Sequence, residues 1–405
     1  MAIQIKRGTS AQRKVSEVVL EAGQPFLETD TGNLFIGKTG TEKLKDLTLD
    51  DCYLSCRTWK ELDPKKKIYG VDLVGSQDPN ALVRTDDAVG LNITVGTSEI
   101  TSDFDNCYPW CDMKEVTDEF GNVFIKIPKF YSKITKNADG TYKHQLSGTK
   151  YEGFSTLFVD KLEHEHDYVL IGKYEGGGSS SRVYSQSGQT PLCNVKINEF
   201  RSGCKANGEG YQQYDYLIDL IIKELWLVEM KTTNCQSIMH GYTGSTILKT
   251  GTTDSVTTPS GSPESNTDGK HACKYRGIEN PWGNVWMLCD GIQCFTNGIS
   301  VCTQPELYSE IGGSRGYMWQ GTLNFSSIYT GYLQKFEPLE RNPLIQFTTS
   351  LDGASATTYF CTMAGVPNTG NILTIRGTSL WGFHPEDKEY VFTRLGGRLC
   401  YKPLV

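Results

Sequence analysis

The sequence predicts an α+β fold that is mostly β, with a small N-terminal β-hairpin module and a large domain of short strands and irregular loops. Three observations predict it. The 405 residues include 42 glycines, 21 tyrosines, 16 phenylalanines and 7 tryptophans, which is typical of a turn-rich β protein with an aromatic core. Short segments of alternating polar and apolar residues recur along the chain. One segment, by contrast, has a sustained helical period.

Residues 1–48 are expected to form a module of their own. Residues 3–7 alternate like a short strand, and the polar residues 9–12 follow as a turn. Residues 24–30 and 34–37 flank the sequence Asp-Thr-Gly-Asn, which is typical of a hairpin turn. So small a module buries little core, and we therefore expect it to need partner chains. Residues 49–67, with three consecutive lysines, are expected to be a solvated connector.

Residues 68–405 are expected to form the large domain. The apolar stripe of its main amphipathic helix, predicted over residues 211–229, consists of Tyr214, Leu217, Ile218, Ile221, Leu225 and Val228. The charged residues Asp215, Asp219, Lys223 and Glu224 lie largely off that stripe. Strands are predicted at residues 68–74, 81–84, 123–131 and 168–174. Residues 244–270 are a low-complexity loop, which at this length we expect to be either mobile or functional.

Charge and hydropathy exclude several classes of function. The net charge of −7 disfavours nucleic acid as a partner, because phosphates need a basic face. No apolar run approaches the roughly 18 residues of a membrane span, so we expect no membrane insertion. The N-terminus lacks the apolar stretch of a signal peptide, and we expect folding in a cytoplasm.

The cysteines and histidines provide weak candidates for metal ligands. Thirteen cysteines are scattered along the chain, and Cys52/Cys56 and Cys107/Cys111 form two C-x3-C pairs among aromatic residues. This spacing is looser than that of a usual zinc site, so we expect reduced thiols and no metal or other cofactor. His164 and His166 share one side of an extended segment, but a solvated loop explains them better than a metal without a third ligand.

The N-terminal module resembles that of phage tail-fibre and tropism-determinant proteins. The resemblance is carried by a basic-Arg-Gly-Thr motif, a Thr-Asp-Thr motif and an aromatic-Ile-Gly motif, in that order. Its residues include Ile5, Arg7, Gly8, Thr29, Asp30 and Phe35. The resemblance implies attachment to the virion or assembly of a homotrimer. An ordinary hairpin that caps the large domain is the alternative.

The strongest local signal lies in residues 275–291, where large aromatic rings alternate with amides and glycine. The residues that define this motif are Glu279, Asn280, Trp282, Gly283, Asn284 and Trp286. Asparagine amides are suited to holding irregular backbone, and glycine permits unusual φ angles. The motif resembles that of C-type-lectin-fold proteins in the formylglycine-generating-enzyme and tropism-determinant group, and more closely lectin-fold proteins from phages of Gram-positive gut bacteria. The resemblance implies a C-type-lectin-like domain in which these residues build the fold.

Resemblance to tropism determinants also implies a binding face near the C-terminus, on loops supported by a rigid scaffold. The candidate ligand-binding residues there are Asn368, Asn371, Trp381, Phe383 and His384. Aromatic rings beside small polar residues would suit sugar stacking or protein contact. The alternative is that Trp381 and Phe383 belong to the core.

We expect no catalytic residues and no enzyme activity. The stretch that compares with the copper-binding cysteines of formylglycine-generating enzymes has no cysteine before Cys400, and no nucleophile elbow occurs. We expect instead a virion structural protein, a tail fibre or receptor-binding protein, that is assembled in the bacterial cytoplasm and attaches to a host cell-surface glycan or protein. Two alternatives stay open: a capsid fibre or baseplate decoration without a receptor role, and a polysaccharide-degrading enzyme.

Overall fold

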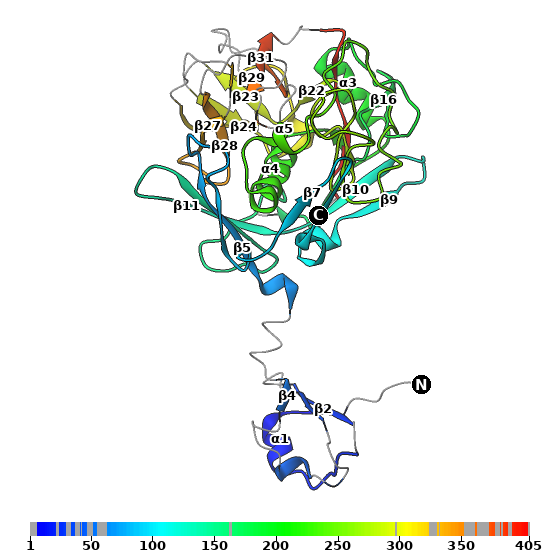
Figure 1. Cartoon of the computed structure of the whole chain (residues 1–405). Helices are drawn as coiled ribbons and strands as arrows, with labels where there is room; N and C mark the ends of the chain where they lie inside the picture. The colour runs from blue at the N-terminus through cyan, green and yellow to red at the C-terminus, as the bar shows by residue number, and fades with distance from the viewer. Residues whose placement is uncertain are drawn as a thin grey trace. The chain divides into compact units, whose positions relative to one another are not determined.

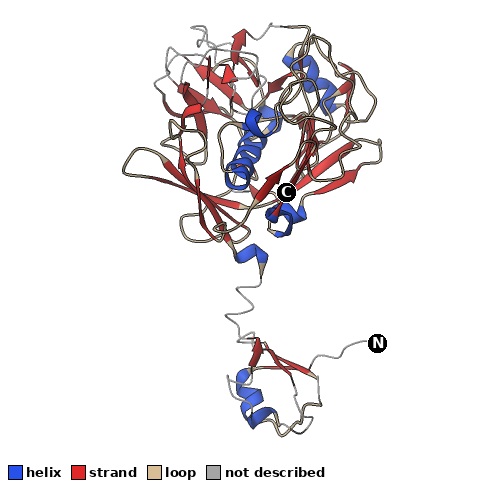
Figure 2. Cartoon of the chain, viewed as in Figure 1, coloured by secondary structure: helices blue, strands red, loops and turns tan. Residues whose placement is uncertain are grey.

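The chain divides into two compact units, Met1–Lys67 and Ile68–Val405. The structure is a computed structural model, and it describes residues 6–21, 24–29, 34–36, 41, 43–46, 52–54, 63–161, 164–295, 298–323, 330–331, 333–351, 361–362, 372–376, 381, 384–387 and 391–403. Strands predominate over helices in both units, as expected for a mostly β chain (Figure 2).

The described part of the first unit is a four-stranded sheet with one short α-helix. Its strands run in the order β1 (Lys6–Gly8), β2 (Pro25–Glu28), β3 (Leu34–Ile36) and β4 (Cys52–Leu54), with β1 and β2 parallel. The predicted turn at residues 9–12 is wrong, because α1 (Ser10–Lys14) begins there. Thr9 and Gln12 cap its first turn reciprocally, a pattern that satisfies free backbone N–H groups. The apolar core of the described part of the unit is Leu20, Phe26, Phe35 and Leu44.

The described residues of the second unit form five sheets of three or more strands. The first is β18 (Tyr211–Gln213), β33 (Leu399–Tyr401), β15 (Tyr168–Gly172), β10 (Val123–Pro128) and β9 (Lys114–Thr117). The second is β11 (Tyr131–Lys136), β12 (Tyr142–Ser147), β5 (Ile68–Val74) and β6 (Val83–Asp86). The third is β21 (Ile278–Glu279), β20 (Lys274–Tyr275), β19 (Ser260–Gly261), β8 (Glu99–Ser102) and β7 (Ile93–Val95).

The remaining strands form two further sheets and four two-stranded pairs. One sheet is β31 (His384–Asp387), β30 (Ile372–Arg376), β22 (Trp286–Cys289) and β32 (Leu395–Gly396), and another is β23 (Ile292–Phe295), β24 (Gly298–Val301) and β25 (Met318–Thr322). The pairs are β13 (Val159–Lys161) with β14 (His164–Glu165), β16 (Gly177–Ser179) with β17 (Arg182–Tyr184), β26 (Thr330–Gly331) with β29 (Cys361–Thr362), and β27 (Leu333–Pro338) with β28 (Gln346–Leu351).

Helix α4 (Tyr216–Met230) runs through the middle of the second unit, between its sheets (Figure 1). It contacts β5 and β12 and contributes to the large apolar core. The predicted helix began five residues too early, because residues 211–213 pair with β33 and Asp215 caps the helix by accepting from the Ile218 N–H. Two further helices are α3 (Ile197–Lys205) and α5 (Cys235–Ile238). No described helix is long and apolar enough to cross a membrane.

The polar face expected on this helix is wrong, because all fifteen of its residues are buried. Each charge is matched inside the protein. Lys223 pairs with Asp219 at 2.6 Å, and Glu224 contacts His144 Nδ1 at 2.9 Å. A helix that is buried all round needs such partners, since an unpaired buried charge is costly.

Candidate functional site

The structure describes two of the five predicted binding residues near the C-terminus, Trp381 and His384. Asn368, Asn371 and Phe383 lie outside the described residues. His384 begins β31, where its backbone pairs with Ile375 of β30. The structure therefore describes a strand at His384 where we expected a loop.

Trp381 is a core residue, which contradicts its place in the predicted binding face. Its side chain is 1% exposed, and its ring lies against Phe336 with 5.4 Å between centroids. The Lys223 ammonium lies 5.9 Å from the same ring. Burying an indole removes more apolar surface from water than burying a small polar side chain does. Trp381 is therefore buried, although the flanking sequence looks like a surface loop.

The central motif, by contrast, lies where a scaffold motif should. Trp282 is buried, its indole N–H donates to the Met239 carbonyl at 3.0 Å, and its ring lies edge-on to Trp226. Gly283 adopts a φ of 84° and packs so closely on Tyr242 that a Cβ would lie 2.8 Å from its backbone N. Trp286 is half-buried beside Phe392.

The two asparagines of the motif converge on one buried carboxylate. Asn280 and Asn284 have φ angles of 45° and 53°, and their amides donate to Glu175 Oε2 at 3.3 and 2.6 Å. Asparagine tolerates this left-handed conformation better than most residues. Asn284 also accepts from the Leu248 N–H at 2.8 Å, which ties the motif to the loop at residues 244–270.

Glu279 anchors the same loop from inside the core. Its carboxylate accepts from the Gly251 N–H at 2.8 Å and from the N–H and hydroxyl of Thr253, each at 2.7 Å. Five polar residues of the loop are buried: Thr250, Thr253, Ser260, Ser262 and Asn266. The segment is therefore anchored to the domain by polar groups supplied from elsewhere, together with its own buried Val256.

Arg398 closes this network. It is fully buried and donates to the carbonyls of Gly172, Lys173, Glu279 and Asn280 at 2.7–3.0 Å. Burial raises the pKa of Glu175 to about 7, and Arg398 and the Asn284 amide oppose that shift. Four segments that are distant in sequence are thus held together by polar contacts.

The raised pKa of Glu175 predicts a specific dependence of stability on pH. A carboxyl whose pKa is higher in the folded protein stabilises the fold fully below its ordinary value of 4.5, and this contribution falls as pH rises through about 7. The loss amounts to about 3 kcal/mol in the free energy of unfolding. Urea unfolding at pH 5 and pH 8 should show that this loss is removed in Glu175→Gln. Equal pH dependence in the two proteins would contradict the assignment.

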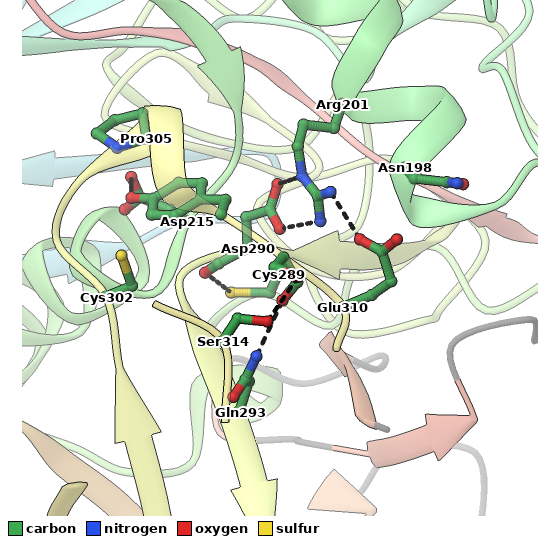
Figure 3. A network of polar contacts seen from close by, with 12 residues as sticks. Asn198, Arg201, Asp215, Cys289, Asp290, Gln293, Cys302, Pro305, Glu310 and Ser314 are labelled. Carbon is green, nitrogen blue, oxygen red and sulfur yellow. Dashed lines mark hydrogen bonds and ion pairs between the residues drawn. The ribbon is translucent and has the colours of Figure 1, made fainter. Parts of the chain in front are cut away.

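The end of the motif is held by a second ion-pair network (Figure 3). Arg201 of α3 donates to both carboxylate oxygens of Asp290 at 2.8 Å and to Glu310 at 2.8 Å. Nearby, Asp215 accepts from the Tyr308 hydroxyl at 2.8 Å. These pairs fix α3, the start of α4 and the turn after β22 relative to one another.

In the first unit, the predicted attachment residues divide between core and surface. Phe35 is buried, which contradicts a role in direct contact with a partner. Arg7 and Thr29 are exposed, Gly8 ends β1, and Ile5 and Asp30 lie outside the described residues. Sequence reasoning missed the buried pair Arg13–Glu28, at 2.5 Å, whose guanidinium lies over the Phe35 ring.

The candidate metal ligands do not gather into a site in the described residues. Within the described ranges, no group of three His, Cys, Asp or Glu side chains could hold a metal ion, and ten cysteines are free thiols. His164 is exposed, whereas His166 is buried. The interpretation of both histidines as part of a solvated loop is therefore wrong for His166.

Comparison with known proteins gives one kind of match. No family model and no curated protein matches the chain. Among solved structures, it is similar to the Major Tropism Determinant M1 variant (TM-score 0.22, 9% identity) and I1 variant (TM-score 0.24, 12% identity), each covering 100% of both chains. TM-scores this low do not establish a common fold, so no site or activity is transferred from these proteins.

Proposed function

We propose that the chain is a phage virion structural protein, a tail fibre or receptor-binding protein. The first unit attaches it to other virion proteins, and the second, with a C-type-lectin-like fold, binds a glycan or protein of the host cell surface. The active form is a homotrimer located in the virion. The protein acts as an adhesin without a cofactor, and neither nucleic acid nor a membrane interior is its partner.

The observation that carries the proposal is the contrast between the two units. The first has an apolar core of four described residues, and so small a core gives little stability unless a partner surface covers it. The second has a large core of its own together with polar networks that fix irregular loops. A dependent unit joined to a self-sufficient one fits an anchor and an adhesin, in the order that the sequence resemblance implies.

A rigid second unit also suits recognition better than catalysis. Loops held by buried hydrogen bonds lose little conformational entropy on binding, which favours affinity for a surface. Glu279, Asn280, Asn284 and Arg398 direct their polar groups to partners inside the protein. Those partners are backbone groups, the Thr253 hydroxyl and the Glu175 carboxylate. The motif therefore supports the loops, and we assign it no binding or catalytic role.

Removal of residues 1–62 should abolish incorporation into virions and leave the melting temperature of the second unit unchanged. The reason is that the second unit has its own core, whereas the first provides the contacts to other virion proteins. The full chain should bind host cells, and the truncated chain should bind them with reduced avidity. Normal incorporation of the truncated chain would contradict the anchor role.

The same preparations separate the alternatives. A capsid fibre or baseplate decoration would enter particles but would not bind host cells as a purified full chain. A polysaccharide-degrading enzyme would release reducing sugar from host capsule, which we expect the full chain not to do.

A further inference from the structure

The described residues of the second unit enclose a hollow of about 790 Å³ at one end of the first sheet. It lies where β18, β33 and the turn between β14 and β15 meet, beside the 3₁₀ turn at Pro305–Leu307. Its volume is in the range of small-ligand sites. The residues that matter for its chemistry are Asp160, His166, Tyr211, Gln212, Glu306 and Lys402.

Three buried polar groups in the wall of this hollow lack hydrogen-bond partners within the described part of the chain. Neither ring nitrogen of His166 makes a hydrogen bond of good geometry, although the Pro403 carbonyl lies near enough to raise its pKa. Gln212 Oε1 has no partner, and Asp160 Oδ1 has only the His164 ring, at 4.0 Å. His166 and Gln212 are each 1% exposed. Leaving such groups unsatisfied costs free energy, so polar atoms gathered in one wall point to a ligand that satisfies them.

The charges around the hollow disfavour an anionic ligand. Lys402 lies 2.6 Å from Asp215, which also accepts from Gln212 and Tyr308, so its charge is compensated inside the protein. Burial lowers the pKa of His166 and the Lys402 ammonium lowers it further, against smaller opposing effects of Asp160, the Pro403 carbonyl and Asp215. A neutral imidazole offers one donor and one acceptor. Asp160, Glu209 and Glu306 also line the hollow, against Lys205, whose ammonium donates to the Pro305 carbonyl at 3.1 Å. Carboxylates therefore outnumber free ammonium groups in the lining, which disfavours anions.

Tyr211 connects this hollow to a second one. It lines this hollow and a second one of about 440 Å³, and the two share Gly208, Glu209 and Tyr211. The Tyr211 hydroxyl donates to Asp118 Oδ2 at 2.8 Å, which fixes the ring where the hollows adjoin. An aromatic side chain fixed between two polar hollows suits a ligand longer than one ring.

We propose that these adjoining hollows form a saccharide-binding site. Sugar hydroxyls act as donors and acceptors at once, so one neutral pyranose ring can satisfy the mixed groups of His166, Gln212 and Asp160, and a second ring can extend past Tyr211. This proposal deepens the proposed function, on which it rests, by naming a neutral glycan as the class of host ligand. The site is distinct from the predicted C-terminal face.

The test uses the full chain and calorimetric titration with methyl glycosides of glucose, galactose, N-acetylglucosamine and rhamnose, with maltose and cellobiose as two-ring probes. At least one neutral sugar should bind, and galacturonic acid should not. His166→Phe keeps the shape of the ring and removes its nitrogens. It should weaken binding at least about tenfold, and a melting temperature measured on the same preparation shows whether the variant is folded.

His271→Phe is the matched control, since His271 lies outside the hollow and is paired with Glu264 and Asp268. It should leave sugar binding unchanged. Asp160→Asn, at a less buried position, gives a second variant should His166→Phe fail to fold, and it should also weaken binding. The site is overturned if no neutral sugar binds, or if both hollow variants bind sugar as tightly as the unchanged chain does.

Adsorption to host cells distinguishes failure of the site from failure of the proposed function. Cell binding that is unchanged in His166→Phe, with no sugar bound, would leave the adhesin intact and remove the saccharide site. Sugar binding without any cell binding would keep the site and contradict the adhesin.

Discussion

Replacing Trp381 by alanine should lower the free energy of unfolding by about 3–5 kcal/mol, as expected for loss of a buried tryptophan. The indole is 1% exposed and packs on Phe336, so its removal leaves a cavity that the surrounding strands cannot fill. Chemical denaturation of the full chain, followed by fluorescence and circular dichroism, measures the change. Adsorption to cells should be unaffected at temperatures where the variant is folded.

Trp319→Ala provides the matched control, because the Trp319 side chain is 40% exposed. It should cost less than Trp381→Ala, since 40% of its surface is already in water. A small loss of stability in Trp381→Ala together with a large loss of cell adsorption would instead restore Trp381 to the binding face.

Replacing Glu229 by alanine should destabilise the second unit by about 3–5 kcal/mol, the range for breaking a buried ion pair from one side. Glu229 lies at the end of α4, where Arg276 donates to both of its carboxylate oxygens and the Tyr275 hydroxyl donates at 3.0 Å. Its loss leaves the Arg276 guanidinium, itself buried, with Asp105 as its remaining carboxylate partner in the described residues.

A double replacement separates the cost of an orphaned charge from the value of the pair. Glu229→Gln with Arg276→Met should recover part of the loss, because no buried charge is then left alone. Glu115→Ala, which removes a carboxylate that is 53% exposed and pairs with Lys173, is the control and should have little effect on stability. A loss below about 1 kcal/mol in Glu229→Ala would contradict the buried-pair assignment.

The parts of the fold that depend on local pattern could be predicted from the sequence. Strands were expected at residues 68–74 and 168–174. The first occurs as β5, and the second as β15, which ends at Gly172. The central helix was expected from its apolar period. Its start was misplaced, because residues 211–213 join a sheet with β33, almost 190 residues later. Such a pairing leaves no signal in the local pattern.

The burial of polar side chains was the main feature that the sequence could not reveal. Glu279 and Asn284 stood out as motif residues, but their partners Thr253 and Glu175 lie 26 and 109 residues away. Without those partners, residues 244–270 look like an unanchored loop. For the same reason His166, beside four other polar residues, looked solvated although it is buried in the wall of a hollow.

The predicted binding face could be tested at one residue, and there it was wrong. Trp381 stands among small polar residues, where a surface aromatic and a core aromatic have the same local sequence. Only the tertiary contacts distinguish them, since the Trp381 ring packs on Phe336 of β27 and lies near Lys223 of α4. The roles predicted for Asn368, Asn371, Phe383 and the His384 side chain stay predictions.

Immunogold electron microscopy of purified phage particles tests the central claim most directly. Antibodies raised against the full chain should label intact particles at the structure that contacts the cell during adsorption, and pre-incubation with the antibodies should block adsorption. Label confined to host debris, with unlabelled particles that adsorb normally, would contradict a virion adhesin.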